Sequence, residues 1–295
     1  MTPRPLKQHE PIEGDFESAL SAIADENKPG IQTPSARPFL KWVGGKRSVL
    51  PELIARLPEK YEAYCEPFLG GAALFFAVKP SKAYLSDVVF PLVLTYIAVR
   101  DDVERLIKQL YVHVANHNKD AYLEARTQLA KETDSTKIGA LMIYLNKTCY
   151  NGLYRVNKSG GFNVPMGSYT APTILDEQNL RWVSKALQGV EIKQHDFSQI
   201  PIQKGNFYYL DPPYHKVYSS YDSSGFVDKN HKELADFCKI LDKAGCWFMV
   251  SNSDTSFIRS LYSHYNVEEV QAGRFVSCKG DGRGKETELI IRNYK

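Results

Sequence analysis

Four consecutive residues, Asp211-Pro212-Pro213-Tyr214, carry groups that could bind a planar molecule. They follow an apolar run over 207–210, which predicts a buried parallel strand. Proline has a fixed φ and no N–H, so its carbonyl is free to face a ligand, and an ionised aspartate only accepts hydrogen bonds. The tyrosine adds a flat face. The four residues indicate a pocket for a planar group with an exocyclic amine, such as a nucleobase. The alternative is a strand-terminating turn with an aspartate cap.

A second candidate is the turn Glu66-Pro67-Phe68-Leu69-Gly70-Gly71, which follows the first predicted strand. Two glycines there let the backbone come close to a ligand. The turn lacks the G-x-G-x-x-G spacing that a dinucleotide pyrophosphate needs. It therefore suits a nucleoside without phosphates, and it disfavours an NAD-dependent oxidoreductase. A tight turn for helix–sheet packing is the alternative.

Two more acids stand at predicted strand ends. Asp87 ends the second strand, where an acid in nucleotide-binding sheets commonly binds ribose hydroxyls. It could equally cap the helix that starts at Val88. Asp196, followed by Phe197, ends a later strand and could accept from an adenine amine while the ring stacks or caps the base. A helix cap or a core contact is the alternative.

The segment Phe39-Leu40-Lys41-Trp42-Val43-Gly44-Gly45-Lys46-Arg47 packs a tryptophan and three bases around a glycine pair. A glycine turn can bring Trp42 and Lys46 to one small ligand. Lys46 would then pair with a carboxylate, and Trp42 would cover an apolar or cationic group. A helix with a solvated basic end is the alternative.

The composition of the chain limits which classes of protein and partner are possible. The chain has 295 residues, 43% of them hydrophobic, and a net charge of +3. Residues 1–36 hold three basic and six acidic residues, a net of −3, so the rest carries +6, which permits a polyanionic partner. The five cysteines form no Cys-x-x-Cys pair and have no histidine cluster beside them. We expect reduced thiols, no metal, no membrane span, no signal peptide and a cytoplasmic protein.

The elements that must position these residues predict an α/β fold. Strands and helices alternate on both sides of a long helical stretch from Val88 to about Cys149, with breaks near Arg100, Asn118 and Asp134. The pattern predicts a Rossmann-like doubly wound mixed sheet of about seven strands with an antiparallel edge hairpin. We expect an acidic flexible tail over 1–36, a catalytic domain over 37–100 and 187–295, and a helical recognition domain over 101–186.

Taken in order, the segments 39–46, 66–71 and 211–214 resemble the Dam-type DNA adenine-N6 methyltransferases. Asn146-Lys147-Thr148-Cys149-Tyr150-Asn151-Gly152-Leu153-Tyr154-Arg155, continued by Gly161-Phe162-Asn163-Val164-Pro165, resembles the target-recognition region of that family. The resemblance covers about residues 37–295. It implies an S-adenosylmethionine-dependent enzyme that acts on double-stranded DNA, as a monomer and without a metal.

The resemblance also implies residue roles. The cofactor contacts that it implies are Trp42, Lys46, Phe68, Gly70, Asp87, Asp196, Phe197 and Asp211. Catalysis would fall to Asp211, Pro212 and Tyr214, which would hold the target adenine. The DNA contacts would be Lys41, Tyr150, Asn151, Leu153, Arg155 and Pro165, at positions that touch DNA in members that methylate GATC.

Adenine inside a duplex cannot reach such a pocket, so the base must be flipped out. Tyr214 would stack on it, Tyr150 could fill the gap, and Arg155 and Lys41 could bind guanine in the major groove. Two basic groups suit phosphates, or are ordinary surface charge. Competing functions are methylation of cytosine N4, an RNA adenine or a protein glutamine, and a catalytically silent DNA-binding module. The first basic group is Lys137, Lys147, Arg155, Lys158, Arg181 and Lys185; the second is Arg274, Lys279, Arg283 and Lys285.

Overall fold

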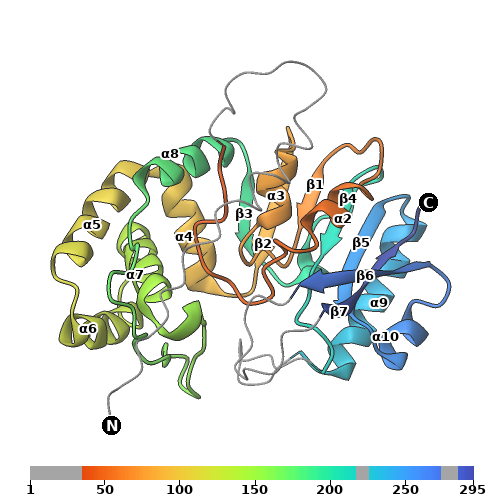
Figure 1. The fold of residues 1–295 in the computed structure, drawn as a ribbon. Helices are drawn as coiled ribbons and strands as arrows, with labels where there is room; N and C mark the ends of the chain where they lie inside the picture. Colours follow the sequence, from red (N-terminus) through yellow and green to blue (C-terminus); the bar gives the residue numbers. More distant parts are fainter. Residues whose placement is uncertain (1–34, 217–225, 274–284) are drawn as a thin grey trace, which may run out of the picture. The chain divides into compact units, whose positions relative to one another are not determined.

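The computed structural model describes residues 35–216, 226–273 and 285–295 (Figure 1). Residues 35–295 form one compact unit. The expected tail over 1–36 lies outside the described residues except for Ser35 and Ala36, and Ala36 is buried. The basic loop over 274–284 also lies outside them.

A seven-stranded mixed sheet forms the centre of this unit, in the order β3-β2-β1-β4-β5-β7-β6. The first five strands of that order are parallel, and β7 runs antiparallel to both β5 and β6. The predicted doubly wound sheet with an antiparallel edge hairpin is therefore confirmed. The strands are β1 (Tyr64–Glu66), β2 (Ala83–Asp87), β3 (Glu191–Gln194), β4 (Phe207–Leu210), β5 (Trp247–Ser253), β6 (Asn266–Gly273) and β7 (Lys285–Arg292).

The chain order reverses between β1 and β4. From β1 the chain winds outward to β2 and β3, then returns to add β4 on the other side of β1. In open α/β sheets, ligands bind at the carboxyl ends of the strands beside such a reversal. The ends of β1 and β4 are Glu66 and Leu210, so the two motifs that follow them meet at this point.

Helices cover both faces of the sheet because its buried strands alternate their side chains between the faces. On one face Tyr208, Leu210 and Phe248 pack with Phe237 of α9 (Asp228–Lys243) and with Ile258 of α10 (Ser256–Leu261). On the other face, the Tyr64 ring lies 6.3 Å from Phe75 of α3 (Ala73–Val78), and α2 (Leu50–Ile54) packs on α3. The sequence pattern did not predict the helices α9 and α10.

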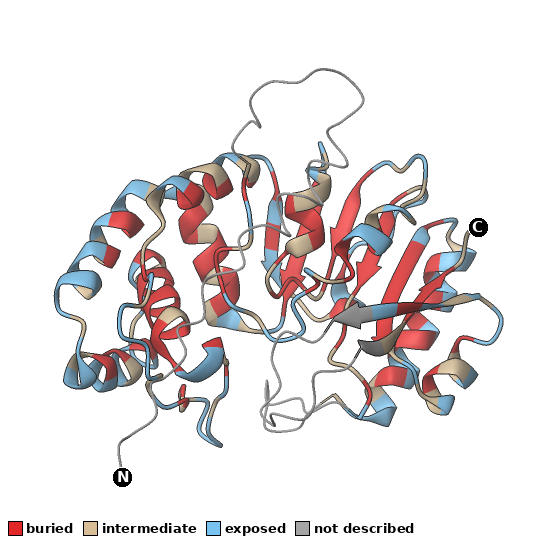
Figure 2. Ribbon diagram, in the orientation of Figure 1, coloured by how far each residue is buried: buried red, intermediate tan, exposed pale blue. Residues whose placement is uncertain are grey.

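Four helices follow β2, and the predicted breaks between them are confirmed. Asn118 Oδ1 accepts from the Ala121 amide and Asp134 Oδ1 accepts from the Lys137 amide, so each acid or amide caps the next helix. α7 is the buried member of the group, and α4, α5 and α6 pack around it (Figure 2). The helices are α4 (Phe90–Asp101), α5 (Val103–Ala115), α6 (Lys119–Leu129), α7 (Ser135–Thr148) and, after an irregular stretch, α8 (Glu177–Ala186).

The helix α2 that follows the glycine pair is short. Lys46 O accepts from the Val49 amide, so a turn follows the glycine pair and α2 begins only at Leu50. Pro51 lies in its first turn and Pro58 follows it, which limits the helix at both ends. Lys46 therefore does not lie at the solvated end of a helix, which was the alternative for this segment.

Among the described helices, none is long and apolar enough to cross a membrane. The four cysteines that the structure describes are buried free thiols. Within the same residues there is no group of three or more histidines, cysteines and acids that could hold a metal ion.

Candidate active site

The carboxyl end of β4 positions Asp211. Its Oδ2 lies 2.8 Å from Lys46 Nζ, in an ion pair whose side chains are 19% and 6% exposed. Its Oδ1 is buried and has no hydrogen-bond partner among the described residues. Burial raises the pKa of Asp211 to about 6, although the Lys46 ammonium acts in the opposite direction. One carboxylate oxygen is thus held by the protein and the other is left to accept from a ligand.

The glycine pair places Lys46 beside Asp211. Gly44 has a φ of +79°, and its carbonyl accepts from Lys46 Nζ at 2.6 Å. The ammonium also lies 4.7 Å from the ring centroid of Tyr214. Two of its three N–H donors therefore go to protein oxygens. The carboxylate that pairs with Lys46 in this structure is that of Asp211, whereas the sequence pattern predicted a carboxylate of a ligand.

The turn after β1 is fixed by Asp87 from the neighbouring strand. Asp87 Oδ2 accepts from the Gly70 amide at 3.1 Å, and Oδ1 accepts from the Val89 amide at 3.0 Å. Burial raises the pKa of Asp87 to about 6. Gly70 has a φ of +44°, and a Cβ there would lie 2.8 Å from Trp42 Cδ1, so only glycine fits. Asp87 therefore shapes this turn.

Aromatic side chains form the walls. The Trp42 ring stacks on Tyr154 at 5.6 Å, with 22° between the planes. Phe68 stacks on Phe197 at 5.6 Å and meets Phe226 edge-on at 5.9 Å. Phe197 is 4% exposed and belongs to the core, so it supports Phe68 from behind. The alternative of a core contact therefore describes the position of Phe197.

Asp196 faces the same space but also caps a 3-10 helix, η2 (Phe197–Gln199). Its Oδ1 accepts from the Ser198 amide at 3.0 Å and from the Ser198 hydroxyl at 2.7 Å. The cap expected as an alternative is present, and the carboxylate still lines the cavity.

These groups surround a cavity of about 600 Å3 at the carboxyl edge of the sheet. It brings together nine of the predicted residues, and Phe197 stands just outside the lining. Among the further lining residues, to which the sequence assigned no role, are Glu66, Tyr154, Phe226 and Asn230. Glu66 and Tyr154 belong to segments that the motifs singled out, whereas Phe226 and Asn230 lie in no motif. The nine are Trp42, Lys46, Phe68, Gly70, Asp87, Asp196, Asp211, Pro212 and Tyr214.

Glu66 is a buried acid at the floor of this cavity. It is 3% exposed, and its Oε2 accepts from the Tyr64 hydroxyl at 2.7 Å. Burial and, to a smaller extent, the nearby Asp211 carboxylate raise its pKa to about 8. At neutral pH the group is therefore mostly protonated, so the Lys46 ammonium faces one carboxylate rather than two.

Five of the six predicted DNA contacts, all except Lys41, lie on one segment that folds back on itself. Val156 bridges Phe162 and Cys149 bridges Met166, both antiparallel, and Asn157 Oδ1 accepts from the Ser159 and Gly161 amides at the tip. We call residues 149–166 the recognition hairpin. Tyr150 and Asn151, in η1 (Tyr150–Gly152), are exposed with Arg155 and Pro165, while Leu153 is half-buried.

Asn146 ties this hairpin to the segment that carries Trp42. Its side chain accepts from the Lys41 amide at 2.8 Å and donates to the Lys41 carbonyl at 2.7 Å and the Gly152 carbonyl at 3.0 Å. Lys41 Nζ lies 4.3 Å from the ring centroid of Tyr169. Tyr154 of the hairpin also stacks on Trp42 of the cavity lining. The hairpin is therefore linked to the segment that carries Trp42 in two ways, through Asn146 and through Tyr154.

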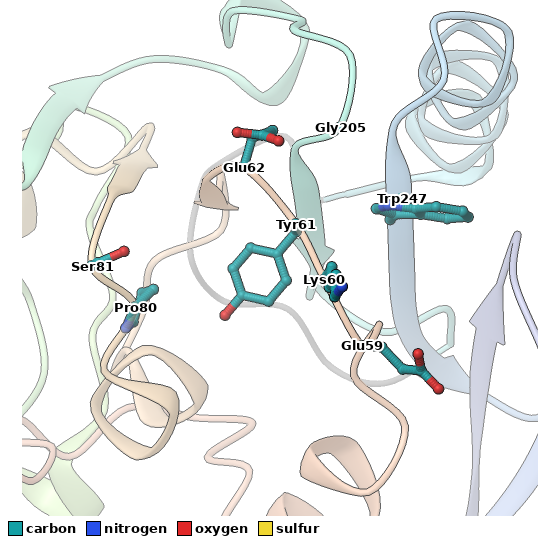
Figure 3. A pocket seen from close by; sticks show the side chains of 8 residues that line it. All are labelled: Glu59, Lys60, Tyr61, Glu62, Pro80, Ser81, Gly205 and Trp247. Atoms are coloured by element: carbon teal, nitrogen blue, oxygen red, sulfur yellow. The ribbon is translucent and has the colours of Figure 1, made fainter.

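A second hollow, of about 680 Å3, lies at the opposite edge of the sheet (Figure 3). Its residues precede or begin β1, β2, β4 and β5, so it faces the amino ends of the strands. It is wide open to solvent and contains none of the predicted site residues. We therefore place the chemistry in the first cavity. The second is lined by Glu59, Lys60, Tyr61, Glu62, Pro80, Ser81, Gly205 and Trp247.

This chain is similar to proteins of one known family. Residues 42–275 match the family of D12 class N6 adenine-specific DNA methyltransferases. The type II methyltransferase M.MjaIII of Methanocaldococcus jannaschii is 40% identical to this chain, covering 88% of this chain and 99% of that protein. For the type II methyltransferase M1.LlaDCHI of Lactococcus lactis the identity is 37%, with coverages of 88% and 95%. A DNA adenine methylase of Vibrio cholerae is 32% identical, with coverages of 86% and 95%. The chain belongs to the D12 class of N6 adenine-specific DNA methyltransferases.

Proposed function

We propose that this enzyme moves a methyl group from S-adenosylmethionine to N6 of an adenine flipped out of double-stranded DNA. Membership of the family supports the adenine-N6 activity. The observation that carries the assignment of the site is Asp211 Oδ1, a buried acceptor without a partner among the described residues. It lies in a cavity that is also lined by Lys46 and Tyr214.

The chemistry of the lining fits S-adenosylmethionine. Phe68 and Trp42 offer flat apolar faces, and Asp87 places a carboxylate at the end of β2, where ribose hydroxyls bind in related sheets. The volume of about 600 Å3 lies within the range of small-molecule sites. Lys46 and the turn around Gly70 would hold the amino-acid end of the cofactor. When bound, this cofactor supplies an electrophilic methyl group on a sulfonium sulfur.

The residues of the chain prepare the adenine amine to attack. Asp211 and the Pro212 carbonyl would accept its two N–H bonds and hold the lone pair in line with the methyl carbon. A C–N bond forms as the S–C bond breaks, with the bonding electrons going to sulfur, and N6 then loses a proton. Asp211 is the acceptor placed to hold that proton. Tyr214 would stack on the flipped base, a contact worth about 1–3 kcal/mol.

For sequence choice we propose GATC or a site that contains it. The support is the set of hairpin residues that match DNA-facing positions of GATC-methylating members, together with their exposure. Arg155 would bind guanine, Tyr150 would fill the space left by the base, and Lys41, Asn151, Leu153 and Pro165 would complete the contacts. On this basis residues 101–186 serve as a recognition domain and residues 37–100 with 187–295 as the catalytic domain of a monomer.

The test is methylation by the purified enzyme of a duplex with one GATC site. The duplex is incubated with S-adenosylmethionine labelled in the methyl group and digested to nucleosides, and the label is identified by mass spectrometry. We expect N6-methyldeoxyadenosine from the wild type. Asp211→Asn keeps the shape but not the charge, and turnover should fall by more than about tenfold, a barrier change above about 1.4 kcal/mol.

The matched control is Asp236→Asn on the exposed side of α9, which should leave turnover unchanged. Label in N4-methyldeoxycytidine would overturn the choice of amine. Cofactor binding by calorimetry without any transfer to DNA would favour a silent DNA-binding module. Equal rates on duplexes changed at one outer base pair would remove the GATC assignment while leaving adenine methylation intact.

A further inference from the structure

Glu288, in the centre of β7, contacts a residue that lines the candidate active site. Glu288 pairs in register with Ser253 of β5 and Val270 of β6, so its position is fixed by two strands. Its Oε2 accepts a hydrogen bond from the Tyr214 hydroxyl at 2.7 Å. Glu288 does not line the cavity. Its hydrogen bond to the cavity lining is therefore made through Tyr214.

Tyr214 in turn connects Glu288 to the reacting groups. Lys46 Nζ lies over the Tyr214 ring at 4.7 Å from its centroid, and the same Nζ is 2.8 Å from Asp211 Oδ2. The four side chains form a continuous chain of carboxylate, phenol, ammonium and carboxylate. Burial, followed by the charges of Asp211 and Glu288, raises the pKa of Tyr214 far above its ordinary value, so the phenol stays neutral and donates.

We propose that Glu288 is a positioning residue of the methyl transfer: it orients the Tyr214 ring and polarises it toward the base that the ring covers. This rests on the proposed function, since it assumes that Tyr214 stacks on the target adenine. A phenol that donates to a carboxylate gains electron density in its ring, and an electron-rich face attracts cations. The adenine amine is neutral before attack and cationic once the C–N bond has formed. The polarised ring therefore favours the transition state over the ground state.

A purely structural role is the competing explanation, because a glutamate in a sheet could bind the hydroxyl only to satisfy it. The two roles differ in what they change. Loss of a packing contact lowers stability and affects cofactor and DNA binding together. Loss of polarisation lowers kcat and leaves KM for DNA and the affinity for S-adenosylmethionine in place.

The experiment is a double-mutant cycle of Glu288→Gln and Tyr214→Phe, with kcat and KM measured on a single-site duplex. Glutamine keeps the shape and an acceptor but removes the charge. We expect Glu288→Gln to lower kcat by about tenfold in the wild type and to have no further effect in Tyr214→Phe, which lacks the hydroxyl. The control is Glu269→Gln on β6, a glutamate of the same hairpin that pairs with Arg259 and should leave kcat unchanged.

The pH profile gives a second readout. The groups that face Asp211 are Lys46, Glu288, Tyr214, Tyr209 and Glu66. Burial is the largest cause of the raised pKa of Asp211, and the carboxylate of Glu288 raises this pKa as well. The substitution Glu288→Gln should therefore move the acid limb of kcat/KM to lower pH. A packing change alone would not move the limb in that direction.

The outcomes separate the two proposals. An unchanged kcat in Glu288→Gln, or an equal loss in the Tyr214→Phe background, overturns the positioning role. If Glu288→Gln does not fold in a thermal unfolding control, Tyr214→Phe with an unaltered kcat overturns it instead. Wild-type enzyme that yields no N6-methyldeoxyadenosine overturns the proposed function itself, whatever the variants do.

Discussion

Among the single residues, Lys46 and Asp211 give a prediction about how the activity depends on pH. In the proposed reaction Asp211 accepts from the adenine amine in its ionised form, and burial raises its pKa to about 6. We therefore expect kcat/KM to rise with pH through an acid limb near 6, since this profile reports groups of the free enzyme.

The substitution Lys46→Met tests this origin of the limb. It removes the cation that opposes the effect of burial, so the limb should move up by about one pH unit or more. The affinity for S-adenosylmethionine should fall in the same variant, more than the affinity for DNA. Arg47→Met, at the neighbouring base outside the cavity lining, is the matched control. A limb that stays in place would show that another group controls it.

Glu66 gives a separate prediction about stability. Its pKa is about 8 in the folded state, above its ordinary value, because of burial. Between about pH 5 and 8 the unfolded chain has released a proton that the folded chain retains. The free energy of unfolding must therefore fall as the pH rises through this window, by up to about 1.4 kcal/mol per pH unit from this group.

Urea unfolding of Glu66→Gln at several pH values checks this contribution. The variant cannot ionise, so its stability should depend less steeply on pH between 5 and 8 than that of the wild type. Glu62→Gln, a glutamate that precedes β1 on the exposed side, should keep the wild-type slope. An identical slope in Glu66→Gln would mean that Glu66 is ionised in the folded protein.

Among the elements, the recognition hairpin fixes the orientation of the Arg155 guanidinium. Its Nε donates to Asn163 Oδ1 at 2.7 Å and its Nη2 donates to the Asn163 carbonyl at 3.2 Å. These bonds use the Nε edge of the guanidinium and leave the Nη1–Nη2 edge for the guanine O6 and N7 contact that we propose. Arg155→Ala should relax the preference at one outer base pair by about 1–3 kcal/mol.

Lys158 at the hairpin tip is the matched control for that prediction. It is exposed, and a lysine that binds phosphate contributes to all sequences alike. Lys158→Ala should therefore weaken binding to every duplex and lower the salt dependence of affinity, without changing the ratio between sites. Methylation rates on GATC and on a duplex changed at one outer position measure that ratio. The same behaviour in Arg155→Ala would assign Arg155 to phosphate.

The elements also show what the sequence could and could not predict. The ends of the strands and the breaks near Asn118 and Asp134 depend on neighbouring residues, and these predictions are confirmed. Contacts between distant elements left no local signal. Glu288 on β7 binds Tyr214, and Tyr154 of the hairpin stacks on Trp42, through the order of strands and the packing of helices.

At the scale of the whole molecule, the structure places the amino-terminal limit of the compact unit. The Arg37 amide donates to Asn179 Oδ1 at 3.0 Å, and Asn179 Nδ2 donates to the Arg37 carbonyl at 3.1 Å, so Arg37 is bound to α8. Ala36 is 5% exposed and Phe39 is 3% exposed. The unit therefore requires the chain from about Ser35 onward, two residues earlier than the boundary predicted from composition.

A chain that begins at Ser35 should fold and bind S-adenosylmethionine as the full chain does, because the described residues that line the cavity fall between 42 and 230. Its kcat on a GATC duplex should also be unchanged. The removed residues are net acidic, with six acids against three bases among residues 1–36, so they repel phosphate. Their removal should leave DNA affinity equal or higher at low salt, with the difference shrinking as salt screens the charges. A companion chain that begins at Leu40 would lose the contacts of Arg37 and Phe39 and should unfold at a lower temperature. Loss of cofactor binding in the chain from Ser35 would contradict the boundary, and loss of DNA affinity alone would assign the acidic segment a part in binding.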